Sequence, residues 1–146
     1  MTYDDWLTVM EVILDGTFNC TNSTYEDIKT ADEGRLINIS WIIGLQGTYG
    51  QANYAASKST LLGFTRSPAL ELAPHGSSAK CVAPGYTHTD MVEQIAEKIQ
   101  QRLRNRIPSG RFAVVEEIAG AVRYLASPAA SYVTGETINV NGGMDL

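Results

Sequence analysis

The chain has 146 residues, of which 44% are hydrophobic and 18% charged, and its formal net charge is −5. This length suits about one domain, and the composition is typical of a globular protein rather than a disordered one. The acidic balance argues against nucleic acid or an anionic membrane surface as a partner.

Helices and short apolar strands alternate along the chain. Apolar residues recur at helical spacing in residues 2–30, and Thr2 followed by Asp5 is typical of a helix N-terminus. The later predicted elements are a strand at 35–40, a helix at 51–73, a strand at 79–83, helices at 89–106 and 115–126, and a strand at 136–140. This alternation predicts parallel strands joined by right-handed crossovers. In such sheets ligands bind beyond the carboxyl ends of the strands.

The chain carries no pattern that predicts export or membrane insertion. Residues 1–12 are polar and acidic, unlike a signal peptide, and no apolar run approaches the length needed to span a bilayer. Cys20 and Cys81 have neither metal-binding nor redox spacing, so we interpret both as buried free thiols. These features predict a cytoplasmic protein.

Tyr54 and Lys58 are the main candidates for chemistry. Being four residues apart, they share one face of the predicted helix. An ammonium group beside a phenol lowers the phenol's pKa, which lets the Tyr act as a general acid or base toward a carbonyl or alcohol. Tyr25 and Lys29 repeat the spacing, but their polar surroundings favour a solvated helix face. Only the Tyr54 pair follows a strand.

Four motifs occur in order along the chain. They are Gly34–Ser40 (GRLINIS), Gly50–Lys58 (GQANYAASK), Val82–Gly85 (VAPG), and Thr134–Glu136 with Asn141–Gly143. Together they resemble the C-terminal part of the short-chain dehydrogenase/reductase family, especially its 3-oxoacyl-carrier-protein and acetoacetyl-CoA reductases. The resemblance implies an α/β fold: the C-terminal half of a Rossmann-type doubly wound parallel sheet, with three strands and flanking helices. Residues 1–146 would form a single partial domain lacking the N-terminal dinucleotide-binding βαβ unit.

The resemblance also implies roles for individual residues. The reaction would be hydride transfer from NADPH or NADH to a 3-oxoacyl thioester. Tyr54 would donate the proton to the carbonyl oxygen, while Lys58 would bind the nicotinamide ribose and lower the pKa of Tyr54. The residues matching the family segment that contacts the nicotinamide end are Pro84, Gly85, Thr87 and Thr89.

Several residues depart from the family pattern. Trp41 stands where the family has a Ser, thirteen residues before the Tyr, and the adjacent Ser40 is expected to point to the opposite face of the strand. Ile13 replaces an Asn that helps to hold a proton-relay water. Pro68 lies inside a predicted helix, at a cost of roughly 3 kcal/mol. We interpret Gly44 and the glycines after it as flexible loop residues rather than a phosphate-binding turn.

Two functions therefore stay open. The first is an NAD(P)H-dependent reductase of 3-oxoacyl thioesters that is inactive as this isolated chain. The alternative is a catalytically silent, truncated remnant that acts as a structural or oligomerisation subunit. In the family, the helices matching 2–30 and 51–73 form one subunit interface and the last helix and strand form another, so the resemblance implies a homo-oligomer.

Overall fold

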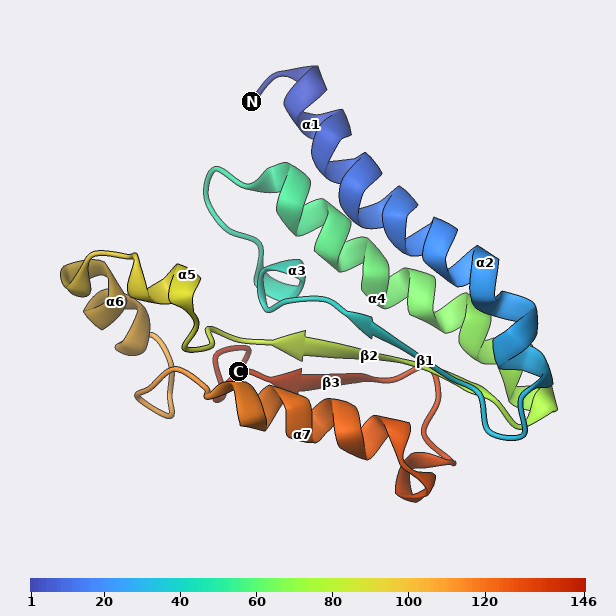
Figure 1. Ribbon diagram of the computed structural model, residues 1–146. Coiled ribbons are helices and arrows are strands. Elements are labelled where there is room, and N and C mark those ends of the chain that lie inside the picture. Colours follow the sequence, from blue (N-terminus) through green and yellow to red (C-terminus); the bar gives the residue numbers. More distant parts are fainter.

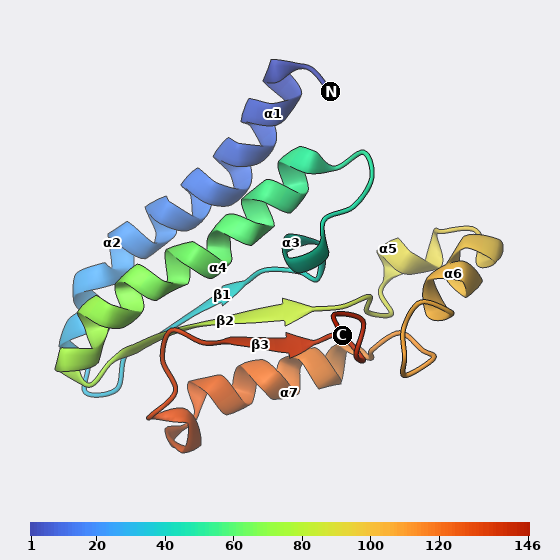
Figure 2. The ribbon, with the colours of Figure 1, turned by 180° about the vertical axis from the view of Figure 1, so that it is seen from behind.

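A three-stranded parallel sheet lies between two layers of helices, which confirms the predicted α/β fold. The computed structural model describes residues 1–146. Helices α2 and α4 cover one face of the sheet and α7 covers the other, as Figures 1 and 2 show from opposite sides. The elements are α1 (Tyr3–Met10), a π-helical turn (Glu11–Asp15), α2 (Gly16–Thr30), β1 (Arg35–Ile39), α3 (Ile43–Gln46), α4 (Ala52–Leu72), β2 (Ser78–Pro84), α5 (Asp90–Glu93), α6 (Glu97–Arg104), α7 (Val115–Ala126) and β3 (Thr137–Val140).

The strands are in the order β1-β2-β3, so β2 is central and β1 lies at an edge. Every residue of β2 is buried, because helices cover both of its faces. On the α4 side, Ala69, Leu72 and Ala79 form a buried cluster. On the α7 side, Val82 and Leu125 form another with Ala130.

Lys80 is a charged residue within this central strand, and its side chain is fully buried. Its Nζ donates hydrogen bonds to the carbonyl oxygens of Leu125 (2.8 Å) and Ala130 (2.9 Å). Burial lowers the pKa of Lys80, and the charge of Arg35 lowers it further. The side chain thus joins β2 to the end of α7 and to the turn that follows it.

The first predicted helix is confirmed as one helical stretch from Tyr3 to Thr30. It consists of α1 and α2 joined by the π-helical turn. Thr2 and Asp5 form the predicted cap, with each side chain accepting a hydrogen bond from the other's backbone N–H. The second predicted helix is also confirmed. Pro68 is buried inside α4 without ending it, so the turn that carries Tyr54 and Lys58 is intact.

Two sequence interpretations are wrong. Cys20 is exposed and lines the open groove between α2 and β1; only Cys81 is buried. Tyr25 does not lie on a solvated helix face. Its hydroxyl donates a hydrogen bond to Glu71 of α4 (2.7 Å), and its ring packs against the cluster around Leu72.

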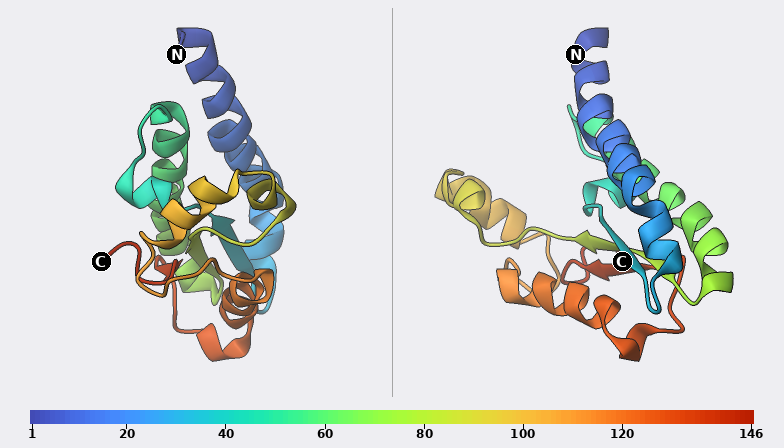
Figure 3. Two further views of the ribbon diagram at one scale, coloured as in Figure 1. Left: turned by 90° about the vertical axis from the view of Figure 1, so that its left-hand side faces the viewer. Right: turned by 45° about the vertical axis from the view of Figure 1, so that its right-hand side comes forward.

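The predicted helix at 89–106 is two helices, α5 and α6, separated by residues 94–96. The break redirects the chain so that Leu103 of α6 packs against the buried cluster of Val92, Ile107 and Phe112. Figure 3 shows α5 and α6 extending from the body at the end toward which the strands point. None of the helices combines the length and apolar character needed to cross a membrane.

Candidate functional site

A cleft of about 540 Å³ opens where β1 and β2 end and α4 begins. All six residues that the sequence singled out lie in its lining, so the fold brings together positions up to 35 residues apart along the chain. The lining consists of Ile39, Ser40, Trp41, Gln51, Tyr54, Lys58, Pro84, Gly85, Tyr86, Thr87, Thr89, Met91 and Val92. This placement agrees with the rule that ligands bind beyond the carboxyl ends of parallel strands.

Tyr54 and Lys58 lie on adjacent turns at the start of α4. The Lys58 Nζ is 5.8 Å from the centre of the Tyr54 ring and donates a hydrogen bond to the carbonyl oxygen of Ile39 (3.0 Å). Burial raises the pKa of Tyr54 and lowers the pKa of Lys58. This direction is opposite to the lowering by Lys58 that the sequence predicts; its cause is burial, and the Lys58 ammonium is directed to the Ile39 carbonyl oxygen.

Trp41 forms an aromatic wall of the cleft. Its ring contacts those of Tyr54 (5.7 Å between centroids) and Tyr86 (5.5 Å), both edge to face. Its Nε1–H also donates a long hydrogen bond of 3.4 Å to the carbonyl oxygen of Gly85. These contacts fix the indole beside the phenol of Tyr54.

Ser40 does not supply a free hydroxyl in place of Trp41. The Ser40 residue is buried, and its Oγ donates a hydrogen bond to the carbonyl oxygen of Lys58 (2.7 Å). Ile13, in the π-helical turn, lines a separate groove between α2 and β1. Ser40 therefore does not replace the family's Ser, and Ile13 does not replace the family's Asn.

Two glycines hold the walls of the cleft close together. At Gly85 a Cβ atom would lie 2.7 Å from the Cα of Asn141, so only glycine lets β2 end against the segment that follows β3. At Gly44 a Cβ atom would lie 2.8 Å from the carbonyl carbon of Lys58. The interpretation of Gly44 as a flexible loop residue is therefore wrong, because it packs α3 against α4.

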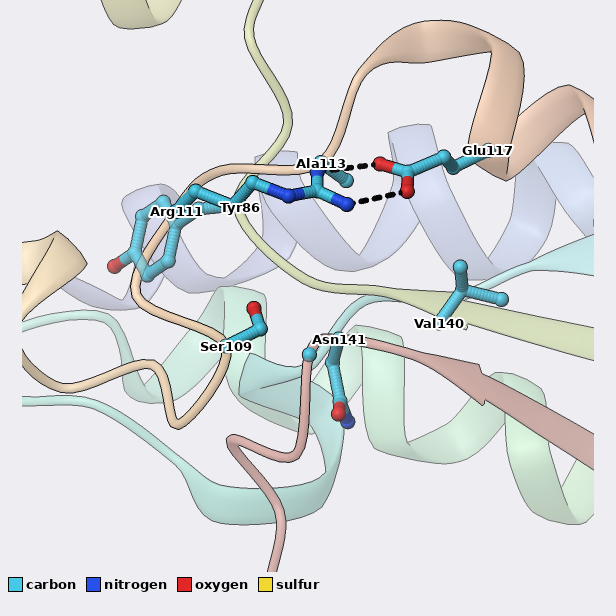
Figure 4. Close-up of a pocket in the computed structure, with 8 residues that line it drawn as sticks. Tyr86, Ser109, Arg111, Ala113, Glu117, Val140 and Asn141 are labelled. Carbon is cyan, nitrogen blue, oxygen red and sulfur yellow. Dashed lines mark hydrogen bonds and ion pairs between the residues drawn. The ribbon is translucent and has the colours of Figure 1, made fainter.

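A second, smaller cavity of about 130 Å³ shares Tyr86 with the cleft, and Figure 4 shows the residues that line it. Arg111 spans it to form a two-pronged ion pair with Glu117 of α7, at 2.7 and 2.8 Å. That guanidinium, together with the backbone N–H of Val114, lowers the pKa of Glu117 to about 2. The sequence analysis missed this ion pair. Its signal was Glu117 itself, because an acidic residue at the third position of a helix commonly accepts a hydrogen bond from the backbone N–H at the helix start.

Comparisons with known proteins agree with the resemblance. Residues 1–145 match the sequence profile of a family described as "Enoyl-(Acyl carrier protein) reductase". A 3-oxoacyl-[acyl-carrier-protein] reductase FabG of Aquifex aeolicus (strain VF5) is 45% identical over 144 residues, covering 99% of this chain and 58% of that protein. An acetoacetyl-CoA reductase of Acinetobacter sp. (strain RA3849) is 42% identical, with the same two coverages. The nodulation protein G of Azospirillum brasilense is 44% identical over 140 residues, covering 96% of this chain and 57% of that protein. The chain thus spans less than two thirds of the length of these relatives.

Proposed function

This chain belongs to the short-chain dehydrogenase/reductase family, and on that premise we propose that it carries the proton-donating part of an NAD(P)H-dependent 3-oxoacyl thioester reductase. The observation that carries the proposal is the cleft, in which Tyr54, Lys58, Pro84, Gly85, Thr87 and Thr89 all lie.

The polar groups of the cleft fit a nicotinamide nucleoside. Lys58 presents an ammonium group beside the phenol of Tyr54, and Thr89 adds a hydroxyl at the start of α5. The ammonium and hydroxyl groups can donate to ribose oxygens and to a carboxamide oxygen. When bound, the nicotinamide supplies the hydride.

Tyr54 acts as an acid in this proposal. Because burial raises its pKa, the phenol keeps its proton at neutral pH and can donate it to a carbonyl oxygen as negative charge develops there. Lys58 holds its place through the Ile39 carbonyl and keeps further N–H groups for a ribose hydroxyl. Thr87 Oγ1 donates to the Gly85 carbonyl oxygen (3.2 Å), which fixes the loop after β2.

The test uses a chimera that joins this chain to the N-terminal part of the Aquifex relative that it does not match. Trp41→Ser and Ile13→Asn are introduced to restore the two polar family positions. NADPH oxidation is then followed with acetoacetyl-CoA. We expect turnover that Tyr54→Phe abolishes, whereas Tyr49→Phe, on an exposed loop residue, leaves it unchanged. Equal rates with and without the Tyr54 hydroxyl would refute the proposal.

A silent structural subunit is the second candidate, and Trp41 is the observation that favours it. The indole fills the position beside Tyr54 where the family has a hydroxyl, and the hydroxyl of Ser40 is bonded elsewhere. A repaired chimera that folds and assembles but shows no turnover would support this candidate.

A further inference from the structure

Positive charge is concentrated in one short segment of this acidic chain. Residues 98–106 contain four of the 11 Lys and Arg residues and none of the 16 Asp and Glu residues. The remainder of the chain is therefore more acidic than the net charge of −5 indicates. Such an asymmetry creates a local positive potential that attracts anions.

Three of the four cations form a stripe on the exposed side of this segment. Lys98, Arg102 and Arg106 are spaced four residues apart, and all three are exposed. None of their side chains takes part in an ion pair or hydrogen bond. We call these three residues the α6 stripe. Lys98 and Arg102 lie one turn apart on α6, about 6 Å along its axis by helical rise, and Arg106 follows two residues after α6 ends.

The fourth cation, Arg104, differs from the other three because its guanidinium has partners within the chain. Its guanidinium pairs with Glu97 and lies 5.3 Å from the centre of the Phe112 ring. It thereby holds α6 against the cluster of Val92, Ile107 and Phe112. The free charges of the stripe are therefore not needed to keep α6 in place.

The stripe lies on an element that adjoins the candidate cleft. Leu103, on the inner side of α6, packs against the cluster that contains Val92, and Val92 lines the cleft. Figures 1 and 3 show α6 beside α5 at the end of the molecule toward which β2 and β3 point. An anion bound to the stripe would thus lie at the same end of the molecule as the cleft.

We propose that the α6 stripe binds the phosphate groups of coenzyme A when a coenzyme A thioester occupies the cleft. The inference rests on the proposed function, which requires a thioester whose pantetheine arm ends in phosphate. Guanidinium groups pair well with phosphate, and coenzyme A offers a diphosphate and a 3′-phosphate. Three exposed cations within nine residues suit such a compact nucleotide, whereas a protein partner would cover roughly 800 Å².

Calorimetric titration of the 146-residue chain with coenzyme A tests the proposal. The variant Arg102→Gln/Arg106→Gln is compared with Arg66→Gln/Arg123→Gln, which removes the same charge from exposed residues of α4 and α7. Because the stripe variant can no longer form two exposed ion pairs with phosphate, its Kd should rise about tenfold. The control variant should stay within about twofold, and the difference should shrink in about 1 M salt. Pantetheine, which lacks the phosphates, should bind all three proteins equally.

Three outcomes overturn the proposal. Equal weakening of binding in the two variants would mean that only bulk charge matters, and no measurable binding to the unaltered chain would mean that the stripe is a solvated face. Binding of an acyl carrier protein that depends on the stripe, while coenzyme A binding does not, would replace the nucleotide with a protein partner. Stripe-dependent binding without turnover in the repaired chimera would instead leave this inference standing and refute only the proposed function.

Discussion

At the residue scale, Trp41 is the main obstacle to the proposed reduction in the cleft. The indole contacts Tyr54 and brings no hydroxyl to the place where a carbonyl oxygen must gain charge. A missing donor to a developing oxyanion costs on the order of 3 kcal/mol in the barrier, or about 100-fold in rate. The bulk of the indole adds a steric penalty.

The first prediction therefore concerns repair of the chimera. The unrepaired chimera should be nearly inactive on acetoacetyl-CoA, and Trp41→Ser with Ile13→Asn should raise its rate by at least about 100-fold. Each substitution is also made alone, to separate the hydroxyl beside Tyr54 from the polar group on the first helical stretch. If the unrepaired chimera already matches the repaired one, Trp41 does not occupy the position of the family's Ser.

Sequence reasoning placed these side chains correctly but not all of their surroundings. The six cleft residues were identified from sequence motifs, and a motif indicates only which residues occur together along the chain. The pKa of Tyr54 depends instead on how much water the fold removes, which no local spacing reports. Gly85 and Gly44 were likewise recognisable as glycines of turns, whereas the atoms of Asn141 and Lys58 that require them come from distant segments.

At the element scale, Lys80 holds the end of α7 in place. Its two hydrogen bonds satisfy the carbonyl oxygens of Leu125 and Ala130, which lie at the terminus of α7 and in the next turn. The end of a helix leaves its last carbonyl groups without intrahelical partners, and here a strand residue supplies the donor. This contact was unpredictable from sequence, because Lys80 and its partners are 45 and 50 residues apart.

The second prediction is that Lys80→Met destabilises the protein by about 1–3 kcal/mol, because buried carbonyl oxygens lose their donor. Urea unfolding followed by circular dichroism measures the change. The matched control is Lys98→Met, at an exposed lysine without a partner, which should shift stability by less than about 0.5 kcal/mol. Equal midpoints for the two variants would show that Met packs as well at position 80 as the hydrogen-bonded lysine.

The third prediction concerns the ion pair at the start of α7. The pKa of Glu117 is lowered from 4.5 to about 2, so its contribution to stability is complete above pH 4.5 and is lost as pH falls toward 2. Melting temperatures measured from pH 7 to pH 2 should decline more steeply below pH 4.5 for the unaltered chain than for Glu117→Gln. Glu116→Gln, at an exposed neighbour, should follow the unaltered chain. Parallel curves for all three proteins would contradict the assignment of this titration to Glu117.

At the scale of the whole molecule, the order of helices and strands was predictable from the sequence. The strand order β1-β2-β3 leaves β1 at an edge of the sheet. Alternating strands and helices gave the parallel sheet, because only crossovers on its faces can connect such strands. The helical pattern of 89–106 did not predict the break between α5 and α6, after which Leu103 packs against the cluster of Val92, Ile107 and Phe112. The edge strand β1 has the sequence RLINI, in which three of five residues are apolar and Arg35 is the one charge.

The fourth prediction is that the 146-residue chain self-associates through this edge. Strand β1 pairs with β2 on one side only, and Ile39 at its end is 43% exposed. Two grooves flank it, one of about 560 Å³ between β1 and α2 and one of about 640 Å³ between the strand ends and α7. Unpaired backbone groups beside exposed apolar surface recruit further chains, and a charged residue on the edge strand is the usual protection against this.

Sedimentation equilibrium of two matched variants tests the edge directly. Ile39→Lys places a charge on β1 and should shift the chain toward monomer, whereas Leu70→Lys places the same charge on an exposed apolar residue of α4 and should not. Both positions are exposed, so neither variant should lose its fold, and circular dichroism confirms this before association is compared. A stable monomer for the unaltered chain would refute edge pairing. If only Leu70→Lys dissociates the chain, the contact between chains involves the outer face of α4 rather than β1, because that substitution leaves β1 unchanged.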